Sequence, residues 1–502
     1  MRPRLMFADG DFDPGAPEPA NAADLVGDLE LGTLWADMAR GDELLLSLAR
    51  AATLNALTDP AEIGYRQQVL ADCLRNPAAV RELFELAGQA IAAERKLLRS
   101  AFTGRPEPLL NRAVRVLEVL GDFLRRLRRL AERHAGEFRS AGFTRLFRTI
   151  RTELDDDYLR TMDALLEQLR FEQGIVVRAG LGEGNKAVGF VLREPPGKVR
   201  NPAGHRALKK SKLSYTVTGR DENDYRALAE LRGRALNEIA NVTAQSADHV
   251  RDFFLALRDE LGFYLGCVNL AETLSGLGMP TCLPAPGAPD EHLLSARGLY
   301  EPCLALRLRR RVVGSDLDAD GRGVIMVGGP NQGGKSTFLR SVGVAQLMMQ
   351  AGMFVAAEEF AASAVTGVFT HYKREEDPSM TSGKLDEELA RMSTIADKAG
   401  RGALLLCNES FTSTNEREGS DIAAEIILAL TDSGLRVVFV THLYELARRM
   451  RAEFPARCLF LRAARRDDGE RTFRLGPGEP SPTAHGTDLY RKIFGTGHGR
   501  PG

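Results

Sequence analysis

The sequence lacks long apolar runs, paired cysteines and net charge, and each absence excludes a class of protein. No apolar stretch approaches the length of a membrane-spanning helix, so we expect no membrane partner. Acidic and proline residues follow the first residues at once, which argues against a secretory signal peptide. The six cysteines are scattered without a Cys-x-x-Cys spacing, which predicts reduced thiols of a cytoplasmic protein and neither a disulfide framework nor a zinc site.

The charge balance leaves the partner open. Lys and Arg number 67 and Asp and Glu number 68, so the chain as a whole shows no attraction to nucleic acid. Any such partner must be held by a local basic patch. At 502 residues the chain is too long for one ordinary core, and at roughly 150 residues per domain we expect about three units.

The first half of the chain has a mainly helical pattern. Residues 1–21 are rich in Asp, Pro, Gly and Ala and are expected to form a flexible leader. Residues 22–275 then show apolar side chains at three- to four-residue spacing, which predicts helices. Within them, residues 174–220 break this period and predict a small β-containing insertion. The Pro- and Gly-rich residues 276–298 are expected to be a linker.

The β-containing insertion carries the densest basic run outside the helices. Few acidic residues offset this run, so it is our candidate for contact with DNA phosphates. Its candidate DNA-binding residues are Lys198, Arg200, Arg206, Lys209, Lys210 and Lys212. A second group of arginines, between Arg125 and Arg133, lies mostly in the C-terminal half of a helix predicted over residues 109–130, and a solvated face explains it better than a DNA contact.

The second half of the chain has the pattern of an α/β domain. Most of its short apolar strands alternate with helical segments, which predicts a sheet covered by helices over residues 299–502. Strands are expected at residues 303–308, 324–327, 365–370, 403–406 and 437–441.

A glycine-rich loop follows the second of these strands. Residues 329–337 read GPNQGGKST and fit G-x-x-x-x-G-K-[ST], the loop whose backbone binds the phosphates of a nucleotide. Because a strand precedes it and an amphipathic helix follows it, a chance match is disfavoured, and a nucleotide with Mg²⁺ is the expected ligand. Lys335 would reach the β- and γ-phosphates, and Ser336 the metal ion. The predicted nucleotide-binding residues in this loop are Gly329, Pro330, Asn331, Gly333, Gly334, Lys335, Ser336 and Thr337.

Two later strands end in polar side chains. Glu409 is expected to orient the attacking water, while Asn408 stands where a metal-ordering aspartate is usual. Because asparagine brings no negative charge, we expect weaker Mg²⁺ binding or slower turnover. His442 ends the other strand and is interpreted as a sensor of the γ-phosphate. The predicted catalytic residues are therefore Lys335, Glu409 and His442, and the predicted metal ligands are Ser336 and Asn408.

Ser382 and Gly383 lie in a polar run in front of another predicted helix. One interpretation is an exposed loop with a helix cap. The other is a second phosphate-binding face at the helix N-terminus, which adds both residues to the nucleotide site.

Together these motifs resemble the ATPase domain of the MutS family of DNA mismatch repair proteins. The stretches are GPNQGGKST at 329–337, LCNE at 406–409, TNEREG at 414–419 and FVTH at 439–442. The resemblance implies an ABC-type P-loop ATPase domain over residues 299–502, preceded by an all-helical core and lever domain with a short clamp. It also implies a homodimer in which Ser382 and Gly383 act on the partner's nucleotide. The family's mismatch-reading and connector domains are expected to be absent, since the core-like helices begin near Ala22.

This resemblance implies a DNA-binding ATPase of mismatch repair, or of a related repair or recombination process, that switches conformation with ATP. We expect it in the cytoplasm, associated with the nucleoid, with other repair proteins as possible partners. An alternative is a nucleotide-gated scaffold that hydrolyses little ATP and recognises no mismatch, which Asn408 favours. A chromosome-organising ATPase with long coiled coils is disfavoured because sustained heptads are missing. The sequence shows no cluster of Asp, Glu and His typical of a nuclease, so DNA strand cleavage is disfavoured.

Overall fold

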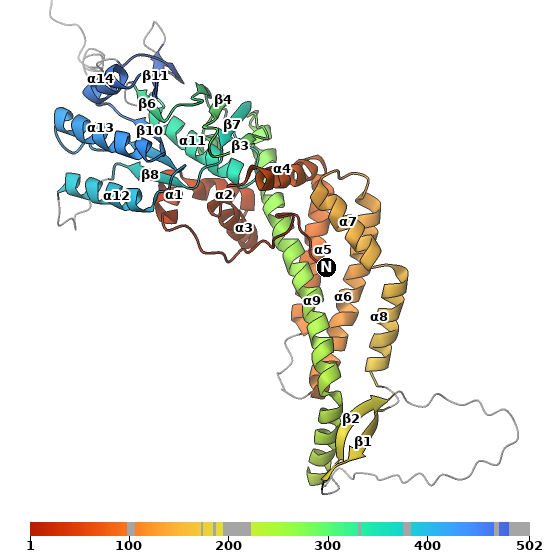
Figure 1. Cartoon of the computed structure of the whole chain (residues 1–502). Coiled ribbons are helices and arrows are strands. Elements are labelled where there is room, and N and C mark those ends of the chain that lie inside the picture. Colours follow the sequence, from red (N-terminus) through yellow and green to blue (C-terminus); the bar gives the residue numbers. More distant parts are fainter. Residues whose placement is uncertain are drawn as a thin grey trace, which may run out of the picture. The chain divides into compact units, whose positions relative to one another are not determined.

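The protein is described by a computed structural model, which places residues 1–97, 106–171, 174–183, 187–193, 222–329, 333–374, 383–465 and 471–480. It is a mixed α and β protein with several sheets (Figure 1). The chain forms two compact units, each built from more than one stretch of sequence. The first comprises Met1–Pro3, Ala78–Phe138 and Phe143–Arg258, and the second comprises Arg4–Pro77, Arg139–Gly142 and Asp259–Gly502.

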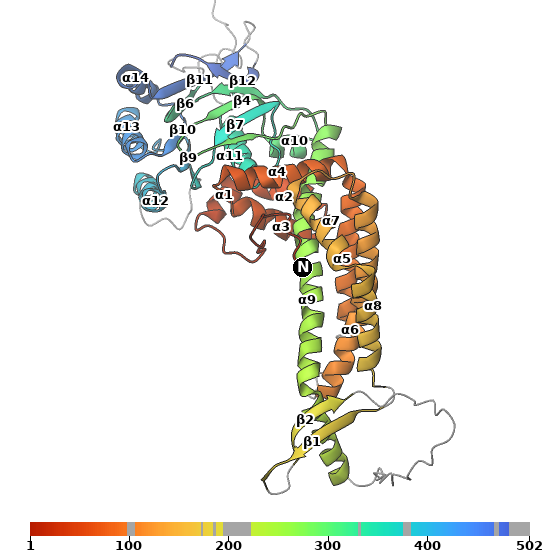
Figure 2. The same ribbon diagram turned by 45° about the vertical axis from the view of Figure 1, so that its right-hand side comes forward.

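The first unit consists of long helices and one antiparallel strand pair (Figure 2). Its elements are α5 (Pro77–Leu97), α6 (Pro106–His134), α7 (Ala141–Glu153), α8 (Asp156–Leu169), the part of α9 (Glu222–Gly276) up to Arg258, β1 (Val176–Leu181) and β2 (Ala187–Arg193). The first residues of α5 and α7 and the end of α9 belong to the second unit. α6 buries one apolar stripe that includes Leu117, Leu120, Leu124 and Leu127, as its spacing predicts. The pair β1 and β2 lies where the sequence predicts a β-containing insertion.

The second unit contains both larger sheets and also the first four helices of the chain. These helices are α1 (Ala22–Asp28), α2 (Leu31–Ala39), α3 (Glu43–Leu54) and α4 (Pro60–Arg75). Asp42 and Asp59 accept hydrogen bonds from backbone N–H groups in the first turns of α3 and α4, which fixes where these helices begin. The compact units therefore divide the chain differently from the domain boundaries that the sequence suggests.

Residues near the start of the chain are packed into the second unit, in contrast to the flexible leader expected over residues 1–21. Leu5 and Met6 are fully buried, and their N–H groups donate to the carboxylate of Glu260. The hydroxyl of Tyr264 donates to the carbonyl of Leu5 at 2.7 Å. Further along, Asn21 Nδ2 donates to the carbonyl of Val368 at 2.7 Å, so the residue before α1 is also hydrogen-bonded to the second unit.

The larger sheet has the strand order β12-β11-β6-β10-β9-β8. Its strands are β6 (Val324–Gly328), β8 (Val368–Tyr372), β9 (Leu404–Asn408), β10 (Arg436–Val440), β11 (Cys458–Arg465) and β12 (Arg471–Pro477). All neighbours are parallel except β11 and β12. Val440 lies opposite both Asn408 and Val327, so the carboxyl ends of the central strands meet at one edge, where ligands of such sheets usually bind.

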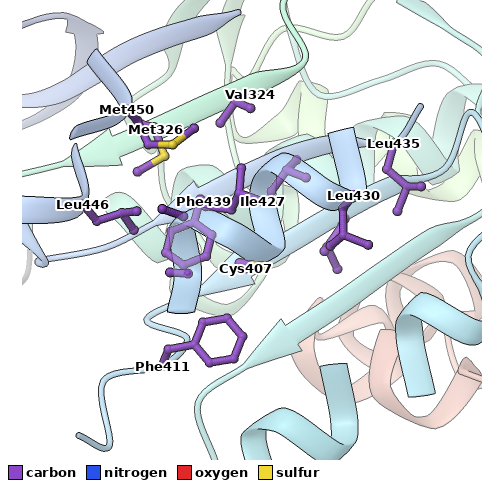
Figure 3. Packing of buried hydrophobic residues seen from close by; sticks show 14 of the residues in the cluster. Val324, Met326, Cys407, Phe411, Ile427, Leu430, Leu435, Phe439, Leu446 and Met450 are labelled. Atoms are coloured by element: carbon purple, nitrogen blue, oxygen red, sulfur yellow. The ribbon is translucent and has the colours of Figure 1, made fainter. Parts of the chain in front are cut away.

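Helices cover both faces of this sheet. α11 (Lys335–Gln350) contacts β8, β9 and β10 on one face. α12 (Lys384–Lys398), α13 (Glu416–Asp432) and α14 (Tyr444–Glu453) pack on the other (Figure 1). Between these helices and the strands lies a buried apolar cluster that includes Met326, Phe439, Ile427 and Leu446 (Figure 3). This core holds the strands in place and so positions the polar residues at their carboxyl ends.

A smaller sheet has the strand order β3-β7-β4-β5. Its strands are β3 (Ala285–Gly287), β4 (Leu294–Leu299), β5 (Ser315–Asp318) and β7 (Glu359–Ser363). The expected linker over residues 276–298 therefore supplies two strands instead of a free connection.

The strand expected over residues 303–308 is a helix, α10 (Pro302–Leu308). Pro302 occupies its first turn, and the Glu301 carboxylate accepts hydrogen bonds from the N–H groups of Cys303 and Leu304. These start signals outweigh the alternation of apolar residues on which the prediction rested. In the portion of the chain that the structure describes, no helix combines the length and apolar character needed to cross a membrane.

Candidate functional site

The candidate site begins where β6 runs into the glycine-rich loop. Gly329 and Gly334 have φ values of +119° and +92°, a left-handed backbone that favours glycine. A Cβ on Gly329 would lie 3.1 Å from the backbone nitrogen of Ala463, and one on Gly334 would lie 3.3 Å from the carbonyl oxygen of Phe473. Any side chain would therefore crowd neighbouring backbone. Gly333 is buried beside this turn, and the predicted residues Pro330 and Asn331 lie outside the described residues.

Lys335 opens α11 and is held inside the loop. Its side chain is 5% exposed, and Nζ donates to the carbonyl of Gly329 at 2.8 Å. Burial lowers the pKa of this ammonium group, and the nearby Glu409 opposes the shift. Gly334 caps α11 without a side-chain acceptor, and the first turn of the helix carries no acid. The N-terminus of α11 thus combines a partial positive charge that no side chain caps with a cation, which suits an anionic ligand.

The two predicted metal ligands lie together. Ser336 Oγ donates to Oδ1 of Asn408 at 2.9 Å, which joins the first turn of α11 to the last residue of β9. Both offer uncharged oxygen atoms, the ligand type that Mg²⁺ accepts when phosphates and water complete its shell. The donor set therefore fits a nucleotide-bound magnesium ion, with less charge than an aspartate would supply.

Glu409 and His442 lie at the ends of neighbouring strands. The N–H of Glu409 donates to the carbonyl of Val440 at 2.9 Å, and Glu409 has a left-handed φ of 56°. Its Oε1 lies 4.0 Å from Nδ1 of His442, whose side chain is 44% exposed. A carboxylate and an imidazole thus face the same edge of the sheet as Lys335 and Ser336. The structure brings together all five residues predicted for catalysis and metal binding.

The other predicted residues are placed only in part. Gly383 caps α12 with an extended backbone, and Asp386 and Glu387 occupy the first turn of that helix. These two carboxylates already interact favourably with the helix dipole and weaken its attraction for a phosphate. Ser382 and the basic residues Lys198, Arg200, Arg206, Lys209, Lys210 and Lys212 lie outside the described residues.

A cavity beside the loop was not anticipated from the sequence. It has a volume of about 360 Å³, and Val312, Val313, Gly334, Thr337 and Phe473 contribute to its lining. Of these, only Gly334 and Thr337 belong to the phosphate-binding motif. The apolar lining comes from segments about 160 residues apart, so no local pattern could have revealed it.

Two family models match the chain over most of its length. The model described as the MutS2 N-terminal domain matches residues 58–277. The model described as MutS domain V matches residues 325–475, which include the strands and loops of the candidate site.

Curated proteins of the same kind are similar in sequence. The chain is 26% identical over 439 residues to the endonuclease MutS2 of Thermus thermophilus, covering 80% of this chain and 54% of that protein. It is 27% identical over 259 residues to the DNA mismatch repair protein MutS of Chloroflexus aurantiacus, covering 48% and 26%. With MutS of Thermotoga neapolitana the identity is 34% over 141 residues, or 28% and 18% of the two chains. The chain thus spans about half or less of each of these relatives.

Proposed function

The chain belongs to the MutS family, and from this premise we propose that it is a DNA-associated ATPase whose conformation changes with ATP binding and hydrolysis. DNA repair is the process that relatives with the printed name DNA mismatch repair protein suggest. We further propose that an ABC-type arrangement in a homodimer carries the switch. In that arrangement Ser382 and Gly383 face the nucleotide of the partner subunit.

One observation carries the ATPase proposal. Five side chains from three separate motifs meet at the carboxyl edge of the parallel central strands of one sheet: Lys335, Ser336, Asn408, Glu409 and His442. This is the edge at which α/β sheets bind nucleotides and at which a helix N-terminus offers its N–H groups. Chance similarity of short motifs would not bring five such side chains together.

Each residue has a distinct proposed role. Lys335 exchanges its bond to the Gly329 carbonyl for the terminal phosphates of ATP. Ser336 and Asn408 would hold Mg²⁺, which neutralises phosphate charge when bound with the nucleotide. Glu409 orients the attacking water and accepts its proton, and His442, at 4.0 Å from that carboxylate, senses the γ-phosphate.

The adjoining cavity is a suitable place for the base of the nucleotide. It opens beside Gly334 and Thr337 and has an apolar lining that includes Val313 and the half-exposed Phe473. An adenine ring gains by leaving water for such a surface, and an aromatic side chain can stack on it.

DNA is the proposed macromolecular partner. The candidate contact is the basic segment that contains Lys198, Arg200, Arg206, Lys209, Lys210 and Lys212. We propose a cytoplasmic, nucleoid-associated location because DNA would be the partner there.

A second candidate function is a nucleotide-gated scaffold with little hydrolysis. The observation in its favour is the uncharged pair of Ser336 and Asn408 at the proposed metal position. Such a scaffold would bind ATP and change conformation while releasing phosphate very slowly.

The test is ATP binding and phosphate release by the purified chain with Mg²⁺. We expect Lys335→Ala to lose tight ATP binding, because the lysine is the mobile cation that the loop directs at the phosphates. We expect Glu409→Gln to keep binding and to lower turnover by about a hundredfold or more, since the amide cannot accept a proton. Lys398→Ala, which changes an exposed lysine at the far end of α12, serves as the control.

Three outcomes separate the candidates. Parent-like ATP binding by Lys335→Ala would refute the assignment of the phosphate loop. Tight binding without measurable phosphate release by the parent would favour the scaffold. Equal turnover of the parent and Glu409→Gln would remove that glutamate from the mechanism.

A further inference from the structure

A buried polar cluster lies beneath the turn that carries Glu409, and its centre is His371 near the end of β8. The side chain of His371 is fully buried. Its Nδ1 lies 2.6 Å from Oγ of Ser410, the residue after Glu409, and its Nε2 lies 3.0 Å from the carbonyl oxygen of Glu388 in α12. The ring also stacks on Phe411, with the centroids 5.5 Å apart and the planes 21° from parallel. One imidazole thus contacts both the turn and the helix.

The turn has a backbone that needs such support. Glu409 and Phe411 both have left-handed φ values, 56° and 62°, although neither is a glycine. Residues other than glycine keep this conformation only where their surroundings hold them in it. Ser410 lies between them, fully buried, and its Oγ is also within 2.9 Å of the His371 carbonyl oxygen. The hydroxyl of Ser410 therefore lies within hydrogen-bond distance of two atoms of one residue in β8.

Glu388 links the same turn to α12 a second time. Its carbonyl faces His371, and its carboxylate accepts a hydrogen bond from the hydroxyl of Ser413 at 3.1 Å. Burial raises the pKa of this carboxyl group, while the Ser413 hydroxyl and the Phe411 N–H oppose the shift. Glu388 thus contacts the segment from Ser410 to Ser413 directly at Ser413, through its carboxylate, and reaches Ser410 through the ring of His371.

The donors and acceptors define the tautomer of a neutral ring. Burial, and next the charge of Arg391, lower the pKa of His371 to about 4, so the imidazole is uncharged near neutral pH. The Glu388 carbonyl can only accept, so the single ring proton lies on Nε2. The single hydroxyl proton of Ser410 is then shared between Nδ1 and the carbonyl oxygen of His371, the two acceptors within its reach. The chain of hydrogen bonds therefore runs from the Glu409 turn through His371 to α12.

We propose that His371 is a positioning residue that fastens the turn bearing Glu409 to α12, so that this glutamate and the helix after Gly383 move together. The inference rests on the proposed ATPase function, in which Glu409 orients the attacking water. A displacement of Glu409 on hydrolysis would then be passed to the N-terminus of α12. In the proposed homodimer, that end faces the nucleotide of the partner subunit.

The test combines amide hydrogen exchange with hydrolysis in Ser410→Ala, which removes only the hydroxyl. We expect exchange to rise about tenfold both at residues 409–411 and in the first turns of α12, because the loss of this buried bond loosens both. The matched control is Ser363→Ala, since Ser363 is also a buried serine, here at the end of β7, and its Oγ accepts the N–H of Leu293 at 3.0 Å in the smaller sheet. That control should change neither segment. Faster exchange of the turn without α12 would overturn the coupling.

The rate of ATP hydrolysis distinguishes positioning of Glu409 from a purely structural role of the cluster. We expect Ser410→Ala to lower turnover about tenfold or more with unchanged ATP affinity, since misplacing a catalytic group by a fraction of an ångström is costly. In a Glu409→Gln background the same change should have no further effect. An equal loss in both backgrounds would refute action through Glu409. If the parent releases no phosphate, the proposed function fails, while the exchange experiment still decides the coupling.

His371→Asn gives an independent check if Ser410→Ala folds poorly. Asparagine keeps a polar group near Ser410 and is too short to reach the Glu388 carbonyl. Exchange should therefore rise in α12 and change little at residues 409–411. Unchanged protection of α12 would contradict the proposal.

Discussion

At the scale of single residues, the least usual feature is the amide of Asn408. It accepts the Ser336 hydroxyl at the position where we propose Mg²⁺, so the protein supplies oxygen atoms there but no negative charge from either residue. Hard divalent cations bind more tightly when a carboxylate is among their ligands. We therefore expect weaker metal binding at this position than an aspartate would give.

We expect Asn408→Asp to lower the Mg²⁺ concentration for half-maximal nucleotide binding by roughly tenfold, because it adds a charge next to the metal position. Titration of Mg²⁺ at fixed ATP measures this. Asn415→Asp is the control, since Asn415 caps α13 through its side-chain oxygen and an aspartate there adds the same charge while keeping the cap. An unchanged Mg²⁺ dependence would mean that another acid already supplies the charge.

At the scale of elements, the stretch around Leu5 and Met6 depends on one buried acid in α9. Glu260 is 2% exposed and accepts the N–H groups of both residues. Burial raises its pKa to about 7, with the two backbone donors opposing the shift. The folded protein therefore binds a proton at Glu260 more tightly than the unfolded chain does.

This shift has a definite sign for stability. Between the ordinary value of 4.5 and about 7, the folded state holds more protons than the unfolded state, so the contribution of Glu260 becomes less favourable as the pH rises. The full change is about 3 kcal/mol. We expect Glu260→Gln, which still accepts a hydrogen bond, to gain stability relative to the parent as the pH rises from 5 to 7.5. Urea unfolding of both proteins across this range measures it, and a constant difference would refute the assignment.

At the scale of the whole molecule, charge is nearly balanced, so the DNA affinity that we propose must come from a local group. Several arginines of α6 pair with acids in the same unit: Arg125 with Asp163, Arg128 with Asp156, and Arg133 with Glu82. These pairs agree with a solvated face, as the sequence suggested. The basic segment around Lys198 to Lys212 therefore remains the leading candidate for phosphate contact.

We expect DNA binding that weakens steeply with salt and discriminates poorly between mismatched and perfect duplexes. Changing Lys209, Lys210 and Lys212 together to Ala should flatten the slope of log K against log salt by up to about three units. A charge-matched control replaces Arg448, Arg449 and Arg451 of α14 by Ala.

ATP hydrolysis without DNA should survive the triple lysine change. A parent-like affinity and salt slope would exclude the basic segment as the DNA contact. A strong preference of the parent for mismatches would contradict recognition by charge and shape alone.

The sequence predicted the elements whose signals are local. The loop before Lys335 and the strand ends at Asn408, Glu409 and His442 are short motifs, and parallel pairing brings such ends together. The roles of these residues stay predictions. The helix α10, the packing of Leu5 on Glu260 and the cluster around His371 could not be inferred in the same way. The cap and proline that start α10 compete with an alternation of apolar residues that suggests a strand. The other two features join residues that are far apart in the sequence.

The bond from Asn21 to Val368 has a consequence for self-association. β8 is the last strand of its sheet among the described residues, and such an outer strand offers unpaired backbone groups to any other chain. The side-chain amide of Asn21 donates a hydrogen bond to one of these carbonyls, that of Val368, and α1 packs against the same strand. The helix at residues 22–28 therefore covers part of this sheet edge, which disfavours pairing with another chain. Disrupting this helix would expose the outer edge of β8 and should lower the solubility of the protein.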